Sequence, residues 1–363
     1  MDVSQESGAA PADAQSGGGV PGVDAAAIGE WLVARGVPLT PPLDFVPITG
    51  GQSNLTYHVT DATGVRAVLR RPPLSMALAS AHDVGREHRI MAALHGTDVP
   101  VPLLLAMCDD TDVTGAPFYV MRYVDGLVLR TRDGAAGALE PAARATVSAA
   151  LVDVLAALHG IEPASVGLDG LGRPDGYVER QLKRWLGQYT DQHVGAIPAV
   201  ERVHARLVAA VPPQQRTSIV HGDYRLDNTL VSPAGEVLAV LDWELCTLGD
   251  PIADLATTLV YWTGPGDVPS GWLDTATVLD GFWDRGRLAE RYAELTGADL
   301  TALSYFAAFA SWKLACVLAG VHARRLGGAI GDVDREVTDR IGAQAAGVAE
   351  QAERILDGEP FLG

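Results

Sequence analysis

The sequence predicts an α+β protein of two lobes, a small antiparallel β-rich N-lobe followed by a larger, mainly α-helical C-lobe. Between residues 43 and 124 the apolar residues mostly recur at a period of two, with one helical stretch among them. After Asp125 they recur mostly at helical spacing. Because 363 residues exceed what one simple core holds, we expect a disordered tail over 1–22, an N-lobe over 23–125 and a C-lobe over 126–363.

The elements of the N-lobe follow the tail in order. The first 22 residues are rich in Gly, Ala, Ser and Pro and lack the basic and apolar regions of a signal peptide, which predicts disorder. Helical spacing then predicts a short helix that stops at Gly36 and Pro38. Turn residues separate the elements beyond it, which are strands at 43–51, 54–60 and 65–71, a helix at 79–96, and strands at 101–108 and 117–124.

A Gly-rich, charged connection leads from Asp125 into the C-lobe. Helical patterns there predict helices at 140–159, 177–189, 200–211, 251–261, 271–295, 299–325 and 332–356. The one interruption runs from Ser218 to Leu241, where three short apolar runs predict strands. The only β structure that we expect in the C-lobe therefore surrounds the segment 221–228.

Charge and composition exclude several classes of function. A net charge of −18 argues against nucleic-acid and anionic-membrane partners, because both require clustered Lys and Arg. The most apolar helical stretch, 300–321, contains Lys313 and lacks the ~20 uninterrupted apolar residues of a spanning helix. Three widely spaced cysteines form no CxxC pair, so we expect neither a disulfide framework nor a zinc knuckle, and a cytoplasmic location.

The segment HGDYRLDN, residues 221–228, packs an unusual amount of polar chemistry between two apolar runs, and LDWE follows at 241–244. A hydroxyl becomes a good nucleophile when a group accepts its proton, and a nucleoside triphosphate needs metal ions on its phosphates. Protein kinases use H-R-D-x-x-x-x-N followed by D-F-G for these roles. The spacing from His221 to Asn228 reproduces the first of these motifs.

This spacing predicts roles for five polar residues of the two motifs, whereas Asp227 receives none. Asp223 is the catalytic base, Asn228 and Asp242 are metal ligands, and Arg225 stabilises charge on the transferring phosphoryl group. His221 is more typical of a residue that braces the loop through hydrogen bonds than of one that titrates. Any single Asp in a loop is usually a turn former or a cap, but the joint spacing favours the site.

The N-lobe is then expected to bind the nucleotide. Its glycine turn supplies backbone and side-chain donors for phosphates at Gly50, Gly51, Ser53 and Asn54. Arg70 stands where protein kinases have the strand lysine, with Glu87 on the following helix as its ion-pair partner and Arg71 as the rival cation. Met121, Tyr123 and Val124 lie at the expected hinge, with Met121 beside the nucleotide's adenine and the backbone from Arg122 to Val124 available to the adenine edges. An ordinary hairpin turn, a surface arginine and an apolar strand are the structural alternatives.

Three further acidic residues lie in the second motif or after it. Asp250 precedes Pro251 as a helix N-cap does, and Asp254 lies in the first turn of the same helix, so both favour structural roles. Glu244 is close enough to Asp242 that a role at the metal or the substrate stays open.

The sequence resembles the aminoglycoside phosphotransferase family, which shares the protein-kinase-like fold with choline kinases. The resemblance rests on the motifs HGDYRLDN, LDWE, GDPIADLA, GGQSNLTY, LRRPP and REHRI. The similarity covers about Phe45 to Gly320 and is closest to the branch with the kinase-like domains of acyl-CoA dehydrogenase family members. It implies ATP or GTP as donor, Mg²⁺ held by Asn228 and Asp242, and a helical insert near Tyr177 to Val211 that helps to form the acceptor pocket. Arg70 departs from the usual lysine.

The leading hypothesis is therefore a small-molecule O-phosphotransferase that uses a nucleoside triphosphate and a hydroxyl acceptor. The acceptor is open between a polycationic antibiotic, as for a resistance or detoxification enzyme, and hydroxylated acyl groups or other metabolites, which the related branch implies. The alternative is a pseudokinase-like module that binds nucleotide or metabolite without turnover. The intact Asp223, Asn228 and Asp242 argue against that alternative.

Overall fold

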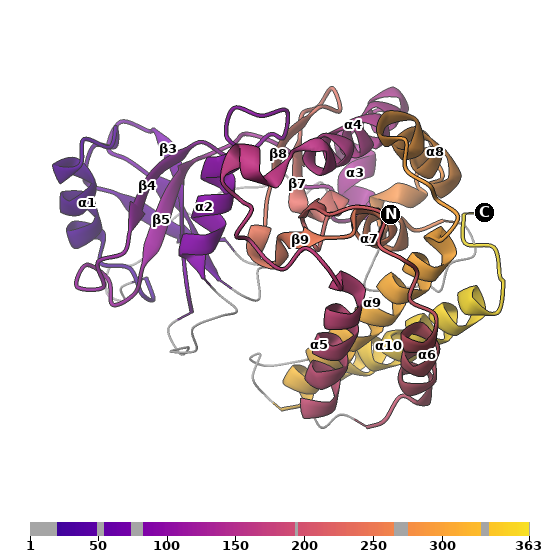
Figure 1. The fold of residues 1–363 in the computed structure, drawn as a ribbon. Helices are drawn as coiled ribbons and strands as arrows, with labels where there is room; N and C mark the ends of the chain where they lie inside the picture. The colour runs from indigo at the N-terminus through magenta and orange to yellow at the C-terminus, as the bar shows by residue number, and fades with distance from the viewer. Residues whose placement is uncertain are drawn as a thin grey trace, which may run out of the picture. The chain divides into compact units, whose positions relative to one another are not determined.

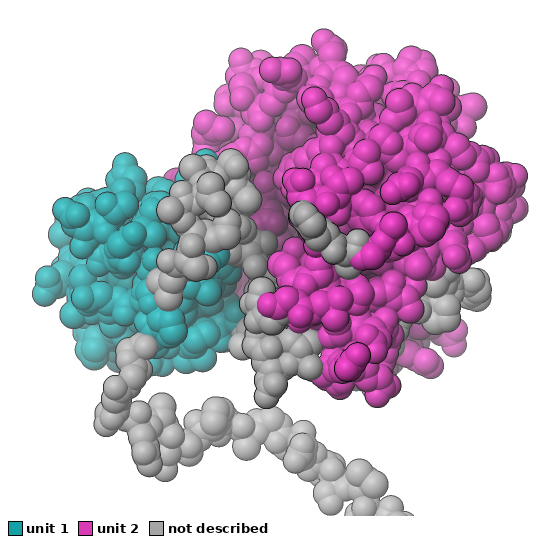
Figure 2. Space-filling view, turned by 90° about the horizontal axis from the view of Figure 1, so that it is seen from below, with its two compact units in different colours: residues 1–85, 105–123 teal, residues 86–104, 124–363 magenta. Residues whose placement is uncertain are grey.

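The structure is a computed structural model, and Figure 1 shows its fold. It describes residues 20–48, 54–73, 83–192, 195–264, 275–327 and 334–362. The chain forms two compact units, shown in Figure 2. The first comprises residues 1–85 and 105–123, and the second comprises 86–104 and 124–363. Residues 86–104, which the sequence analysis assigned to the N-lobe, thus group with the second unit.

The first unit is built on a five-stranded sheet in the order β1-β2-β3-β5-β4. The pairs β1–β2, β2–β3 and β3–β5 are antiparallel, which confirms the predicted antiparallel β structure of the N-lobe. Its strands are β1 (Asp44–Pro47), β2 (Leu55–Thr60), β3 (Arg66–Arg71), β4 (Leu104–Cys108) and β5 (Phe118–Arg122).

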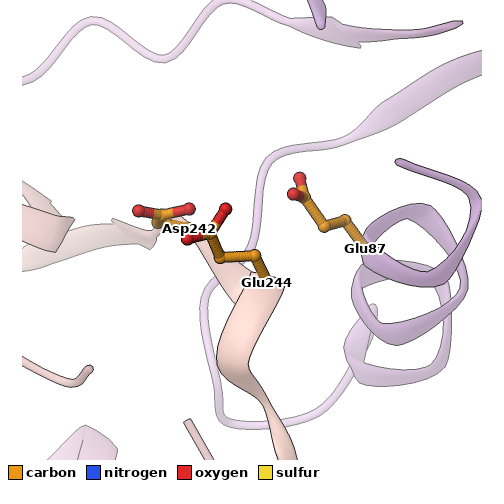
Figure 3. A group of neighbouring side chains, drawn as sticks. All are labelled: Glu87, Asp242 and Glu244. Carbon is orange, nitrogen blue, oxygen red and sulfur yellow. The ribbon is translucent and has the colours of Figure 1, made fainter. Parts of the chain in front are cut away.

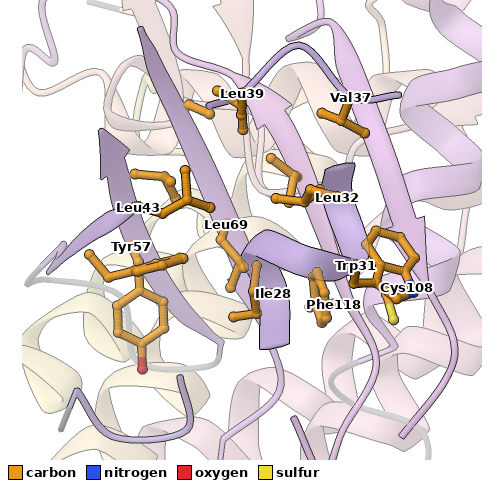
Figure 4. Close-up of a cluster of buried hydrophobic side chains, with 14 residues drawn as sticks. Ile28, Trp31, Leu32, Val37, Leu39, Leu43, Tyr57, Leu69, Cys108 and Phe118 are labelled. Atoms are coloured by element: carbon orange, nitrogen blue, oxygen red, sulfur yellow. The ribbon is translucent and has the colours of Figure 1, made fainter. Parts of the chain in front are cut away.

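Helix α1 (Ala25–Ala34) supplies the core of the first unit, shown in Figure 4. The side chain of Asp24 accepts a hydrogen bond from the backbone amide of Ala27 at 3.0 Å and caps the helix. Ile28, Trp31 and Leu32 follow at helical spacing and are buried with the sheet residues Tyr57, Leu69 and Phe118. The rings of Trp31 and Phe118 meet edge to face, with centroids 5.4 Å apart.

The second unit is mainly helical. Its helices are α2 (Val84–Leu94), whose first two residues belong to the first unit, α3 (Arg132–Ala138), α4 (Pro141–Gly160), α5 (Tyr177–Asp191), α6 (Pro198–Ala209), α7 (Pro251–Tyr261), α8 (Arg285–Thr296), α9 (Leu303–Leu326) and α10 (Arg335–Leu356). Its strands form two antiparallel pairs, β6 (Ser218–Val220) with β9 (Thr247–Gly249) and β7 (Thr229–Val231) with β8 (Val237–Val240).

Helix α9 is the central helix of the second unit and packs against α5, α6, α7 and α10. Both α4 and α9 are long and apolar enough to cross a membrane by length and composition, each with a mean hydropathy of 1.4. In α9, however, 83% of the most apolar window is buried within the protein, as in the core helix of a globular unit.

Three details of the second unit differ from the sequence-based expectation. The helix expected at 271–295 begins only at Arg285 within the described residues, because Gly281 has φ +102 and the Asp284 side chain caps α8 through the amide of Arg287. The connection after Asp125 contains α3, capped by Thr131. Strand β9 was missed because its three residues have no periodicity of their own and pair with the distant β6.

Candidate active site

The two polar motifs connect the same two β ladders. The segment 221–228 runs from β6 to β7, and the segment 241–246 runs from β8 to β9. Because β6 pairs with β9 and β7 pairs with β8, the two segments lie side by side. The backbone amide of Leu241 donates to the carbonyl oxygen of Asn228 at 2.8 Å, which brings Asn228 and Asp242 to neighbouring positions.

Asp254 fixes the start of the first motif from the first turn of α7. Its Oδ2 accepts the backbone amide of His221 at 2.7 Å, and its Oδ1 accepts that of Gly222 at 2.8 Å. His159 lies 3.2 Å from the same carboxylate, and its other ring nitrogen lies 2.7 Å from the hydroxyl of Tyr292. Burial raises the pKa of Asp254, but its hydrogen bonds with His159 and with the backbone amide of His221 lower it by more, so the carboxylate is held ionised.

His221 is fully buried and links the two motifs. Its Nε2 donates to the carbonyl oxygen of Leu241 at 2.9 Å, and its Nδ1 accepts the backbone amide of Asp223 at 3.3 Å. A carbonyl only accepts and an amide only donates, so these bonds require the neutral tautomer with its proton on Nε2. The ring acts as a brace in this arrangement, and both of its nitrogens are occupied.

The carboxylate of Asp223 is oriented from one side. Its Oδ2 accepts hydrogen bonds from Nδ2 of Asn228 at 3.0 Å and from Nε of Arg225 at 3.3 Å. Nδ2 of Asn228 also donates to the backbone carbonyl of Asp223 at 2.9 Å. The two atoms of Asp223 that Asn228 contacts are both acceptors, so the nitrogen of the Asn228 amide must face Asp223. Oδ1 of Asn228 is therefore turned away from Asp223.

Arg225 lies over the ring of Tyr261, with its guanidinium carbon 4.7 Å from the centroid. Its NH1 donates to Oδ2 of Asp227 at 2.9 Å, so one arginine pairs with two carboxylates. Burial alone lowers the pKa of Arg225, but the charges of Asp223 and Asp227 raise it above its ordinary value. Arg225 is therefore a permanent, positioned cation beside the candidate base.

The second motif places Asp242 in a backbone conformation that is rare for a side chain. Its φ of 66° is the one positive value at a non-glycine residue among the described residues. Oxygen atoms of Asp242, Glu244 and the buried Glu87 lie within 4.8 Å of one another, and Figure 3 shows Glu87 reaching toward the other two from α2. Carboxylate and amide oxygens suit a hard cation such as Mg²⁺.

Arg86 holds the second motif from the start of α2. Its guanidinium donates to the carbonyl oxygens of Glu244 at 3.3 Å, of Leu171 at 3.4 Å and of Cys246. Sequence reasoning did not find Arg86 as part of this site, because its acceptors are backbone atoms that lie up to 160 residues away.

The predicted nucleotide-binding residues lie mostly in the first unit. Gly50, Gly51 and Ser53 lie outside the described residues, and Asn54 is buried just before β2. Arg70 is half-buried on β3, and Glu87 lies in the second unit. Met121 is buried on β5, and Tyr123 and Val124 follow that strand, half-buried.

Arg71, the rival cation, is almost fully buried. Its guanidinium donates to the carbonyl oxygens of Gly22, of Thr114 at 3.2 Å and of Pro72 at 3.3 Å. These bonds assign Arg71 to the backbone of the first unit, and Arg70 stays the predicted cation for phosphate.

Lys313 is a further residue at the site that the sequence analysis noted only as a charge in an apolar helix. Its Nζ donates to the carbonyl oxygen of Gly222 at 2.5 Å from the middle of α9. A lysine between buried apolar residues was the available signal, because a charge is rarely buried without a specific partner.

A smaller sheet-based unit and a larger, mainly helical unit that carries both motifs are typical of the kinase-like fold. The chain belongs to the phosphotransferase enzyme family (APH), whose pattern matches residues 44–306. This confirms the resemblance seen in the motifs.

The similar proteins agree with this assignment. Acyl-CoA dehydrogenase family member 10 of Mus musculus is 37% identical over 301 residues, which are 80% of this chain and 27% of that protein. A crystal structure of a candidate aminoglycoside phosphotransferase from Ralstonia eutropha JMP134 is 32% identical with a TM-score of 0.74, over 91% of this chain and 98% of that chain. The chain spans about a quarter to two fifths of the curated relatives that it matches.

A more distant structure shows the fold alone. It is a thermostable mutant of an aminoglycoside phosphotransferase in a ternary complex with AMP-PNP and hygromycin B, 16% identical with a TM-score of 0.59. The match covers 91% of this chain and 98% of that chain.

Proposed function

We propose that the protein transfers the γ-phosphoryl group of ATP or GTP to a hydroxyl group of a small molecule. The arrangement of Asp223 carries this proposal. Its Oδ2 is held by Arg225 and Asn228, while within the described part of the chain no donor reaches its Oδ1. About a quarter of the side chain is exposed, so Oδ1 is available to an acceptor hydroxyl.

In the proposed reaction the acceptor oxygen attacks the γ-phosphorus and its proton passes to Asp223. The bond from the γ-phosphorus to the β,γ-bridging oxygen breaks, and the nucleoside diphosphate leaves with that oxygen. Arg225 compensates the negative charge of the transferring group. Oδ1 of Asn228 and the carboxylate of Asp242 would hold Mg²⁺, which supplies charge neutralisation on the phosphates when bound.

The identity of the acceptor is a further proposal. The curated relatives are named acyl-CoA dehydrogenase family members, and the chain matches only part of each. A hydroxylated acyl group is therefore the first acceptor class to test. The solved complex with hygromycin B makes an aminoglycoside the second class.

A coupled assay for the nucleoside diphosphate, supported by ³¹P detection of the product, tests the proposal. The acceptors are hydroxyacyl-CoA compounds, aminoglycosides, macrolides and choline-like amines, each with ATP or GTP and with or without Mg²⁺. We expect product with at least one acceptor, and its loss in Asp223→Asn. Tight nucleotide binding with no product from any acceptor would instead support a binding module without turnover.

A further inference from the structure

Lys313 is the only charged residue in the stretch from Leu303 to Val321 of α9. Its side chain is buried, with 9% of the residue exposed, and its ammonium nitrogen lies 5.4 Å from the ring centroid of Trp185 on α5. Burial lowers the pKa of Lys313, while the negative charges of Asp223 and Asp254 raise it and that of Arg184 lowers it. The lysine thus occupies an apolar helix next to the candidate catalytic loop.

The contact of Lys313 completes a series of bonds along the backbone of that loop. Asp254 accepts the amides of His221 and Gly222, which belong to two successive peptide planes. The third plane joins the carbonyl of Gly222 to the amide of Asp223. Lys313 donates to the carbonyl at 2.5 Å, and the ring of His221 accepts the amide at 3.3 Å.

A planar peptide that is bound at both ends cannot rotate without breaking one of its bonds. An ammonium group on the carbonyl also polarises the peptide and strengthens its amide as a donor. The third plane ends at the Cα atom of Asp223, so its orientation sets the direction in which the carboxylate leaves the backbone.

Stability gives no reason for a charge at this position. A buried ionic group is often no more stabilising than a well-packed apolar residue of similar volume, because the ion loses its hydration. A methionine at 313 would fill the same space between apolar neighbours. The charge is therefore better explained by what it contacts.

We infer that Lys313 is a positioning residue, which holds the Gly222–Asp223 peptide and through it orients the carboxylate of Asp223 for phosphoryl transfer. The inference deepens the proposed function and rests on it for its effect on turnover. The effect of Lys313 on the backbone of the loop can be measured by hydrogen exchange, which requires no turnover.

The test uses the full chain and three variants. Lys313→Met removes the ammonium with little change in volume, and Lys313→Gln keeps an N–H donor without the charge. Trp312→Phe is the matched control, because Trp312 is buried on the same helix and its Nε1 donates to a backbone carbonyl outside the loop, that of Val200, at 2.9 Å. Each variant is compared with the parent in steady-state kinetics and in hydrogen exchange.

In kinetics we expect Lys313→Met to lower kcat by about 10- to 100-fold while the KM for the nucleotide stays within about twofold. Lys313→Gln should lower kcat by a smaller factor. Trp312→Phe should keep the kcat of the parent per folded molecule. A kcat within about twofold of the parent in Lys313→Met, or the same loss in Trp312→Phe, would overturn the inference.

In hydrogen exchange by mass spectrometry we expect peptides that cover 221–223 to exchange about tenfold faster in Lys313→Met and unchanged in Trp312→Phe. If Lys313→Met does not fold, the same comparison is made with Lys313→Gln. Unchanged exchange in a folded Lys313 variant would refute the positioning role. Absence of turnover in the parent would defeat only the proposed function, because the exchange measurement needs no acceptor.

Discussion

The side-chain amide of Asn228 donates a hydrogen bond to Oδ2 of Asp223 at 3.0 Å, so the candidate metal ligand and the candidate base are joined directly. This bond fixes the rotation of both side chains. It also turns the side-chain oxygen of Asn228, the atom that a hard cation binds, away from Asp223.

The first prediction concerns the base. Asp223→Asn keeps the size of the side chain and an acceptor for Asn228, but it cannot take a proton from the acceptor hydroxyl. Turnover should fall by about 10²- to 10⁴-fold while Mg-nucleotide binding is retained, measured by initial rates and by titration calorimetry. Asp153→Asn is the control, because Asp153 is an exposed partner of Arg291. Full activity in Asp223→Asn would exclude the base assignment.

The second prediction concerns the metal. Asp242 has φ 66°, which Asn tolerates better than Ala, so Asp242→Asn removes the charge with little backbone strain and Asp242→Ala removes the ligand oxygen as well. Both variants should weaken nucleotide affinity at least about tenfold when Mg²⁺ is present and leave it unchanged when Mg²⁺ is absent. Binding titrations over a range of Mg²⁺ concentrations check this. An unaltered dependence on Mg²⁺ would disprove the ligand role.

The third prediction concerns the backbone at Gly222. This glycine has φ +83, and a Cβ atom there would lie 2.8 Å from the carbonyl oxygen of Leu245. Gly222→Ala should cost about 3 kcal/mol or more of unfolding free energy, from the conformation and the clash together, and should reduce turnover.

Gly297→Ala separates these two costs. Gly297 has φ +66 after α8, and nothing lies within 4 Å of its Cβ position. This variant should lose about 1 kcal/mol and keep its activity. Urea unfolding measures both variants, and equal losses of free energy would contradict the clash.

The fourth prediction concerns pH. Burial raises the pKa of Asp250 to about 6, against an ordinary value of 3.8, although the amide of Ile252 and the charge of Arg216 oppose the rise. Between these values the folded protein binds a proton that the unfolded chain has released, so the contribution of Asp250 to stability falls as pH rises through this window.

Asp250→Asn removes this contribution and keeps a good N-cap for α7. The free energy of unfolding of the variant should therefore rise relative to the parent from pH 4 to about pH 6.5 and then level off. Urea unfolding at each pH checks the difference, and a difference that does not vary with pH would contradict it. Asp284→Asn is the control, because it makes the same Asp-to-Asn substitution at the N-cap of α8, where the side chain is exposed.

Much of the fold followed from local patterns, and each error has a physical cause. The strands of the first sheet and most helices of the second unit were predicted because their apolar residues repeat over several turns or alternations. Strand β9 has three residues, too few for a period, and it exists because β6 offers it a partner. The late start of α8 depends on Gly281, where a glycine inside an apolar pattern gave only a weak signal.

The sequence by itself determined the chemistry of the loop, because Asp223, Arg225, Asn228 and Asp242 lie within 20 residues and short hairpins bring such neighbours together. Only the tertiary structure decided what holds that loop. Asp254 contacts it from 33 residues away and Lys313 from 91, and such contacts depend on how α7 and α9 pack, which no local pattern encodes. A buried charge becomes interpretable only when its partner is known, and here Asp254 and Lys313 both bind backbone atoms of the loop, which every sequence has.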